Sequence, residues 1–183
     1  MSLTNLEIKA RCADLDAVRE RARAVATSHL GIDRQTDTYF ATQRGRLKLR
    51  ESSLSGGQLI PYLRPDQRGP KNSDYGVIPI QEPESVKTLL TEILGVHRVV
   101  RKVRDIWLHE NVRIHLDQVE GLGSFVELEA VYDGAPESLP TQQERVHFLM
   151  ERLGIGEEDL VDLSYEGLLD QPAVAPAPEQ SVS

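Results

Sequence analysis

The sequence predicts an α+β fold in which a mostly antiparallel β-sheet is accompanied by a few helices. The first observation is that several segments alternate apolar and charged residues, which is typical of half-buried strands. The second is that these segments follow one another in runs, with glycine-containing turns between them and few helices interrupting them. Strands joined directly by short turns pair antiparallel, which favours this class over a parallel sheet with crossover helices.

The predicted strands share one pattern of alternation. In residues 5–11, Leu6 and Ile8 point to one side of the strand, while Glu7 and Lys9 point to the other. Pro61 lacks a backbone N–H, so the strand that contains it is expected at an edge or a bulge. We expect further strands over residues 34–41, 46–50, 58–65, 96–109, 113–117 and 124–132.

Four helices are predicted from capping residues and apolar spacing. Asp14 is expected to cap a helix that runs to about residue 28. Pro83 predicts the start of a second helix, which ends at residue 94 before a glycine. Thr141 and Glu144 form the pattern of a capping box for a third helix that ends at residue 153. A short final helix is expected over residues 164–170.

A single domain is expected over residues 1–170, and residues 171–183 are predicted to form a disordered tail rich in proline and alanine. The formal net charge of −8 argues against general nucleic-acid binding, because phosphate backbones are held by clustered positive charge. The single cysteine, Cys12, allows no intramolecular disulfide. Neither a signal-peptide-like run nor a stretch of ~20 apolar residues is present, so we expect a cytoplasmic protein with no membrane association.

The charged faces of the strands sort by sign. Charged side chains occupy nearly every polar-face position, and RLKLR at residues 46–50 places three like charges on one face of one strand. Neighbouring like charges repel one another unless an anion compensates them. The basic residues in these positions are Lys9, Arg11, Arg46, Lys48, Arg50, Arg64, Lys102, Arg104 and Arg113, and the acidic ones are Glu7, Asp117, Glu127 and Glu129.

Two interpretations of these faces are open from the residues. A half-exposed antiparallel sheet has one wet face, and for any single strand this is the simpler interpretation. Alternatively, basic rows face acidic rows across a closed sheet and together bind a polyanion with its metal ion. Glu127 and Glu129 favour the second interpretation, because two carboxylates about 7 Å apart on one face gain from a divalent cation.

The side chains available as ligands indicate Mg²⁺ or Mn²⁺ rather than zinc. Carboxylate oxygens are abundant on the polar faces, histidines are few and no usable thiol is present. His115 lies between Arg113 and Asp117 on the same face. It is either a base or substrate contact, or a neutral hydrogen-bonded histidine.

An ordered set of sequence stretches resembles one known family. Residues 5–9 read NLEIK, which contains the second glutamate and the lysine of the family signature E-x-E-x-K. The stretches QTDTYF, GRLKLR, YLRPDQRGPK, VVRKVRDIW and RIHLDQVEGLGSFVELE follow in the family's order. From about residue 4 to residue 169, the chain therefore resembles the CYTH superfamily of class IV adenylate cyclases, thiamine triphosphatases and other triphosphate tunnel metalloenzymes.

This resemblance implies a closed, eight-stranded antiparallel β-barrel, or tunnel, with flanking helices. It implies that Lys9 and Glu7 are catalytic, with Lys9 beside the reacting phosphate, and that Lys71 is a loop contact to the substrate. Asn5 stands where the signature has its first glutamate, and an amide is a weaker metal ligand that cannot act as a base. The resemblance further implies phosphate ligands at Lys48, Arg50, Arg64, Lys102, Arg104 and Arg113, and metal ligands at Glu7, Asp117, Glu127 and Glu129.

The predicted function is that of a Mg²⁺- or Mn²⁺-dependent enzyme acting on a triphosphate. Water as the nucleophile would give hydrolysis of ATP, tripolyphosphate or thiamine triphosphate, and an internal ribose hydroxyl would give cyclic AMP. The alternative is a non-catalytic polyphosphate or nucleotide sensor, which Asn5 favours. A charged scaffold without a ligand is a third, weaker interpretation. The oligomeric state is open, with a homodimer among the alternatives.

Overall fold

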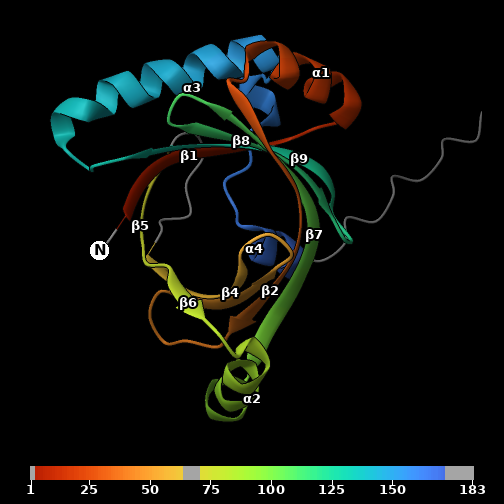
Figure 1. The fold of residues 1–183 in the computed structure, drawn as a ribbon, viewed down its shortest axis with the longest axis vertical. Coiled ribbons are helices and arrows are strands. Elements are labelled where there is room, and N and C mark those ends of the chain that lie inside the picture. Colours follow the sequence, from red (N-terminus) through yellow and green to blue (C-terminus); the bar gives the residue numbers. More distant parts are fainter. Residues whose placement is uncertain (1–2, 64–70, 172–183) are drawn as a thin grey trace, which may run out of the picture.

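The structure is a computed structural model that describes residues 3–63 and 71–171 (Figure 1). In these ranges a curled antiparallel sheet carries two helices on its convex side, and the confirmed class is α+β. The strands are β1 (Leu3–Arg11), β2 (Ser28–Phe40), β3 (Arg46–Ser52), β4 (Gly56–Leu63), β5 (Lys71–Tyr75), β6 (Ile78–Ile80), β7 (Val96–His109), β8 (Val112–Val119) and β9 (Gly123–Tyr132). The helices are α1 (Leu15–Val25), α2 (Pro83–Leu94), α3 (Leu139–Leu153) and α4 (Tyr165–Asp170).

The strand order in the sheet is β3-β2-β7-β8-β9-β1-β5-β4-β6, with an additional pairing of β3 with β4. The β3–β4 ladder joins seven residue pairs, whereas within the described residues β4 and β5 share only Tyr62↔Tyr75 and Leu63↔Asp74. Pro61, which precedes this short ladder, has no N–H to donate to it. The expectation of an evenly closed eight-stranded barrel is therefore corrected: the sheet is a curled half-barrel that opens along the short β4–β5 side.

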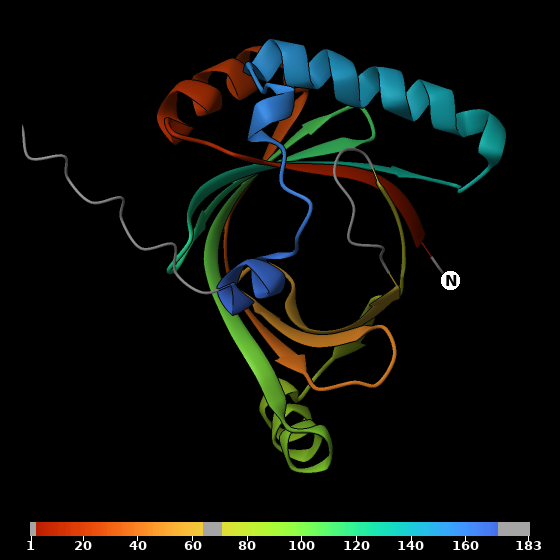
Figure 2. The same ribbon diagram turned by 180° about the vertical axis from the view of Figure 1, so that it is seen from behind.

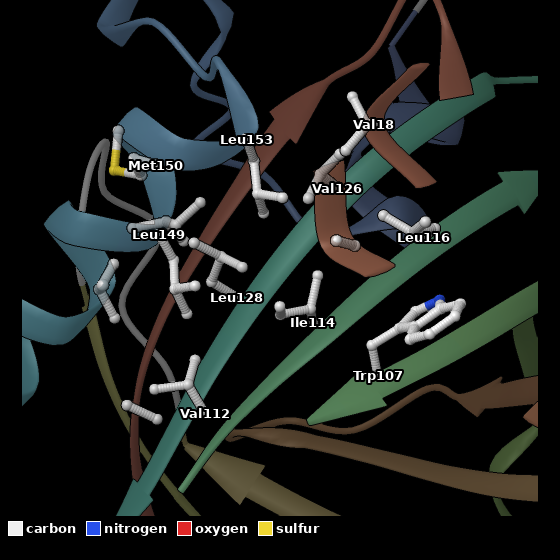
Figure 3. Close-up of a cluster of buried hydrophobic side chains, with 14 of the residues drawn as sticks. Val18, Trp107, Val112, Ile114, Leu116, Val126, Leu128, Leu149, Met150 and Leu153 are labelled. Atoms are coloured by element: carbon white, nitrogen blue, oxygen red, sulfur yellow. The ribbon is translucent and has the colours of Figure 1, made fainter. Parts of the chain in front are cut away.

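The main core lies between the convex face of the sheet and the helices α1 and α3. The alternation predicted for residues 5–11 is confirmed, because Leu6 and Ile8 are buried on this side. Figure 3 shows Leu149 and Leu153 of α3 facing the strand residues Ile114 and Leu128. Burial of this apolar area is the main term that holds α3 and α1 on the sheet.

Most of the predicted helix signals are confirmed, but α1 ends at Val25 and not near residue 28, because the chain is already extended at Ala26 and β2 begins at Ser28. The Asp14 side chain accepts a hydrogen bond from the Ala17 backbone N–H at 2.9 Å and caps α1. α2 covers the predicted residues and ends at Gly95, whose φ of 76° lies in the region that favours glycine. The predicted capping box of α3 is wrong: α3 begins two residues before Thr141, with Ser138 at the N-cap position and a proline in the first turn. The strands β5 and β6 were not predicted from the sequence.

Helix α4 lies within the curve of the sheet in both views (Figures 1 and 2). It carries Tyr165 and Leu168 into a second buried cluster, where Tyr165 packs edge-on against Phe125 with ring centroids 5.1 Å apart. The last helix therefore fills part of the concave side and brings a tyrosine to the charged face. No helix of the described residues is both long and apolar enough to cross a bilayer.

Candidate functional site

The concave side of the sheet encloses a cavity of about 420 Å³, which we call the concave cavity. Strands from all round the sheet contribute to it, because the polar residues of each strand point inward while the apolar ones meet α1 and α3. Its lining residues are Asn5, Glu7, Lys9, Tyr39, Lys48, Arg50, Gln58, Ile60, Tyr62, Tyr75, Val77, Lys102, Arg104, Arg113, His115, Glu127, Glu129, Ser164 and Tyr165.

The lining has a basic side and a side where carboxylates and cations are mixed. Lys48 and Arg50 come from β3, whereas Glu127 and Glu129 come from β9. Between β3 and β9 the sheet order places β2, β7 and β8 in one direction and β4, β5 and β1 in the other. Glu127 and Glu129 thus lie across the cavity from Lys48 and Arg50. The signs are only partly separated, because Lys9 lies 3.5 Å from Glu127 and Arg113 lies 3.2 Å from Glu129.

Asp37 on β2 holds three of the cations together from behind the lining. Its carboxylate accepts hydrogen bonds from Arg50 Nε at 2.7 Å and Nη2 at 2.8 Å, and from Lys48 Nζ and Lys102 Nζ at 3.0 Å each. The three cations hold the pKa of Asp37 well below its usual range although burial opposes this. Sequence reasoning missed Asp37, which stands as a single aspartate between two threonines in the stretch QTDTYF.

A second buried ion pair joins β7 to β8. Arg104 donates two hydrogen bonds to Asp117, from Nε at 2.7 Å and from Nη2 at 2.6 Å, and a third to Glu127 at 3.1 Å. The Tyr165 hydroxyl donates to Asp117 at 2.7 Å. This network fixes the Arg104 guanidinium in the wall of the concave cavity and connects it to α4. Tyr165 is a further site residue that the sequence did not reveal.

The acidic side of the cavity is organised by an amide. Asn5 Nδ2 donates to Glu129 at 2.6 Å and to Glu7 at 3.4 Å, so one neutral group bridges two carboxylates. Glu129 also accepts a hydrogen bond from Arg113 at 3.2 Å and one from the Tyr75 hydroxyl at 3.4 Å. Burial raises the pKa of Glu129, but His115 and, to a smaller extent, Arg113 hold it below its usual range.

Lys9 and His115 both face Glu127. Lys9 Nζ lies 3.5 Å from Glu127 and 4.1 Å from the centre of the Tyr165 ring. His115 Nδ1 lies 3.2 Å from Glu127. Burial and the neighbouring Arg104 lower the pKa of His115, which favours the neutral form at neutral pH. The neutral, hydrogen-bonded histidine considered from the sequence agrees with this geometry.

Burial and the neighbouring cations lower the pKa values of two lysines. Burial and the nearby Arg50 lower the pKa of Lys48 to about 7. Burial likewise lowers the pKa of Lys102 to about 8, with Asp37 opposing the shift. Near neutral pH, Lys48 is therefore only partly charged while Lys102 keeps most of its charge, and an anion in the cavity would favour the charged forms of both.

Comparison with known proteins decides the family. The CYTH domain family matches residues 3–165, which is most of the chain. The chain belongs to the CYTH family. Among curated relatives, it is 27% identical over 175 residues to the adenylate cyclase CyaB of Aeromonas hydrophila, covering 91% of this chain and 88% of that one.

Solved structures show the same fold for this CYTH domain. The PH1012 protein of Pyrococcus horikoshii OT3 superposes with a TM-score of 0.76 at 24% identity, covering 90% of this chain and 98% of that chain. A Hippeastrum candidate adenylyl cyclase, described as having a dominant triphosphatase activity, has a TM-score of 0.57 at 16% identity. It covers 91% of this chain and 94% of that one.

The carboxylates of the CYTH domain fit a divalent cation in part. Glu7, Glu127 and Glu129 line the concave cavity and offer the oxygen donors that Mg²⁺ prefers. Asn5 Oδ1 is buried and accepts no hydrogen bond from the described part of the chain, which leaves one more oxygen donor beside Glu129. Asp117 does not fit, because it is fully buried and its oxygens are bonded by Arg104 and Tyr165.

Within the described ranges, no group of three or more histidine, cysteine, aspartate or glutamate side chains is arranged to hold a metal ion by itself. Mg²⁺ is commonly bound by one or two carboxylates together with substrate phosphates. The donor set of the CYTH domain therefore suits a cation that arrives with a triphosphate better than a permanently bound one.

The structure brings together most of the residues that the sequence singled out. The side chains that line the concave cavity include Lys9, Glu7, Lys48, Arg50, Lys102, Arg104, Arg113, Glu127 and Glu129. Arg46 lies 3.3 Å from Glu166 of α4 and is not among the lining residues. Arg64 lies outside the described residues. Lys71 pairs with Glu7 through the backbone of β5, and its side chain also lies outside the described part.

Proposed function

We propose that this CYTH domain is a metal-dependent enzyme that binds a triphosphate in the concave cavity and transfers its terminal phosphoryl group to water. One observation carries the proposal. A cavity of about 420 Å³ is lined by six cations (Lys9, Lys48, Arg50, Lys102, Arg104 and Arg113) and by three carboxylates (Glu7, Glu127 and Glu129). Cations at such density repel one another, and a polyanion would relieve that repulsion.

The proposed roles follow from where each residue lies. Arg50 and Arg104 are held by two hydrogen bonds each to buried aspartates, which pre-orients their remaining N–H groups for phosphate oxygens. Lys48 and Lys102 add point charges beside Arg50. Positioning and neutralisation of charge are the main sources of catalysis in phosphoryl transfer, so such a wall of fixed cations suits the reaction.

The acidic side of the cavity would supply the metal and the reacting end. When bound, Mg²⁺ or Mn²⁺ would neutralise charge on the phosphate oxygens, and Glu7, Glu127 and Glu129 would hold it. Lys9 lies beside Glu127 and is proposed to stabilise the charge of the phosphoryl group that is transferred. Glu7 is two residues before Lys9 on the same strand and is proposed to orient the attacking water.

Two further outcomes have support of their own. Formation of cyclic AMP would use the same cations with a ribose hydroxyl as the nucleophile, and the name of the Aeromonas relative favours it. A non-catalytic sensor is favoured by Asn5, which bridges Glu129 and Glu7 where a carboxylate would otherwise add a metal ligand. A cytoplasmic location and a homodimer stay predictions.

The deciding assay measures released phosphate and cyclic AMP for tripolyphosphate, ATP and thiamine triphosphate, each with Mg²⁺, Mn²⁺, Ca²⁺ or EDTA. We expect phosphate release with Mg²⁺ or Mn²⁺, and binding without turnover with Ca²⁺, because phosphoryl transfer favours a small cation with near-octahedral geometry. Cyclic AMP from ATP would select the cyclase outcome. Stable binding without any product would select the sensor, and turnover in EDTA would refute metal dependence.

A further inference from the structure

Asp37 lies behind the wall of the concave cavity and contacts three of its cations. Its side chain is fully buried and is not among the lining residues, whereas Lys48, Arg50 and Lys102 all line the cavity. The four contacts that join them to Asp37 measure 2.7–3.0 Å. Each of these cations is thus placed between a buried negative charge and the space where an anion would lie.

Another aspartate on the same strand shows what a purely structural carboxylate looks like here. Asp33 is also buried, but it accepts hydrogen bonds from the neutral groups of Gln35, Ser52, Ser53 and the Leu54 backbone. These contacts fix the turn between β3 and β4. Asp37 instead accepts its hydrogen bonds from ammonium and guanidinium groups, so its surroundings differ in kind from those of Asp33.

One carboxylate cannot neutralise three cations. The cluster therefore keeps an excess of positive charge when empty, and burial adds to the cost of that charge. The lysines respond by losing protons more readily: the pKa of Lys48 falls to about 7 and that of Lys102 to about 8, while Asp37 raises both. At pH 7.5 these values leave roughly one of the two ammonium charges in place.

Other charged and titratable groups act on the two lysines from the neighbouring elements. Those that face Lys48 are Asp37 and Tyr39 on β2, Arg50 on β3, Tyr62 on β4, Lys102 on β7 and Glu166 on α4. Those that face Lys102 are Asp37, Arg50, Arg104, Asp117 and Tyr165. Asp37 is the carboxylate within hydrogen-bond distance of both lysines, so its charge acts on both at once.

We propose that Asp37 is a positioning residue of the triphosphate site: its buried carboxylate holds Lys48, Arg50 and Lys102 where they face the cavity, and its negative charge favours the protonated form of both lysines. This inference rests on the proposed function, because it assumes that the ligand of the cavity is a polyphosphate. Asp37 favours partial protonation of the two lysines before the ligand binds. The negative charge of the bound anion then favours their full protonation.

The test is calorimetric titration of tripolyphosphate into the full chain at pH 7.5 in EDTA, in buffers of different ionisation enthalpy, which counts the protons taken up. Asp37→Asn removes the charge but keeps the shape, so both lysines lose protons more easily in the empty site. Proton uptake should rise from about one toward two, and affinity should fall more steeply from pH 6.5 to pH 8.5. The protons of tripolyphosphate itself cancel in the comparison with the wild-type chain.

Asp33→Asn is the matched control, because it changes a buried aspartate of the same strand that is held by hydrogen bonds from neutral groups. It should lower thermal stability while leaving proton uptake at the wild-type value. Lys48→Met provides a test that does not depend on the folding of Asp37→Asn. It removes one of the two titrating groups and also a positive charge close to Lys102, which raises the pKa of Lys102. Proton uptake should therefore fall well below the wild-type value.

Equal proton uptake in the wild type, Asp37→Asn and Lys48→Met would overturn the role of Asp37. The same would follow if Asp37→Asn only lowered stability, as Asp33→Asn is expected to do. If the wild-type chain binds tripolyphosphate neither in EDTA nor with Mg²⁺, the proposed function fails instead, so the two failures are distinguishable.

Discussion

Arg50 offers the sharpest single perturbation of the proposed site. Its guanidinium has five N–H donors, of which Asp37 takes two, at 2.7 Å and 2.8 Å. The side chain is 15% exposed and lines the cavity, so the other donors can reach a bound phosphate. Loss of one hydrogen bond to a charged group costs about 1.5–3 kcal/mol. Arg50→Ala should therefore weaken triphosphate binding roughly ten- to hundred-fold.

The fold should survive this change, because Asp37 keeps Lys48 and Lys102 as partners and the apolar core lies on the other face of the sheet. The assay is titration calorimetry with tripolyphosphate, together with thermal unfolding of the empty protein. Arg101→Ala is the matched control: Arg101 is exposed, adjoins Lys102 on β7 and does not line the cavity. Unchanged affinity in Arg50→Ala, or unfolding of this variant without ligand, would refute the reasoning. The charged residues of the sheet would then be structural ion-pair partners and not ligands of a triphosphate.

Three other perturbations follow from the same geometry. Glu129→Gln keeps the shape but weakens a proposed metal ligand, so turnover should fall sharply and recover in part at high Mg²⁺; recovery of none or all of the activity would contradict this. Tyr75 faces the cavity beside Val77, so Tyr75→Ala should weaken the binding of ATP and thiamine triphosphate about ten-fold or more by loss of ring stacking. The binding of tripolyphosphate, which has no ring, should not change, and Tyr75→Phe, which keeps the aromatic ring, is the control. The empty wild-type protein should gain stability relative to Lys48→Met between pH 7 and pH 10, measured by thermal unfolding. The reason is that the unfolded chain, with lysine pKa values near 10.4, binds more protons in this window than the folded one, in which the pKa of Lys48 is about 7.

The alternating strands of the fold could be predicted because each carries its own signal. Leu6 and Ile8 alternate with Glu7 and Lys9, and the structure places the two pairs on opposite faces of β1 as expected. Short or polar strands carry no such signal, so β5 and β6 were missed. The closure of the sheet was overestimated, because the two-pair contact between β4 and β5 depends on tertiary geometry around Pro61.

The site was predicted as far as it depends on surface charge. Lys48, Arg50 and Lys102 were identified from their alternation, and they line one cavity in the structure. Their buried partner Asp37 was not, because a single aspartate between threonines gives no pattern that distinguishes a counter-ion from a solvated residue. Tyr165 was also missed, since its contact with Asp117 joins residues 48 positions apart in the sequence.

The structure of the protein with bound tripolyphosphate tests the central claim most directly. The account predicts phosphate oxygens within hydrogen-bond distance of Lys48, Arg50, Lys102 and Arg104, in the concave cavity. A second hollow of about 590 Å³ is lined by the exposed residues Arg34 and Arg101 and offers a competing basic site. Tripolyphosphate bound there, with the concave cavity unchanged, would contradict the account.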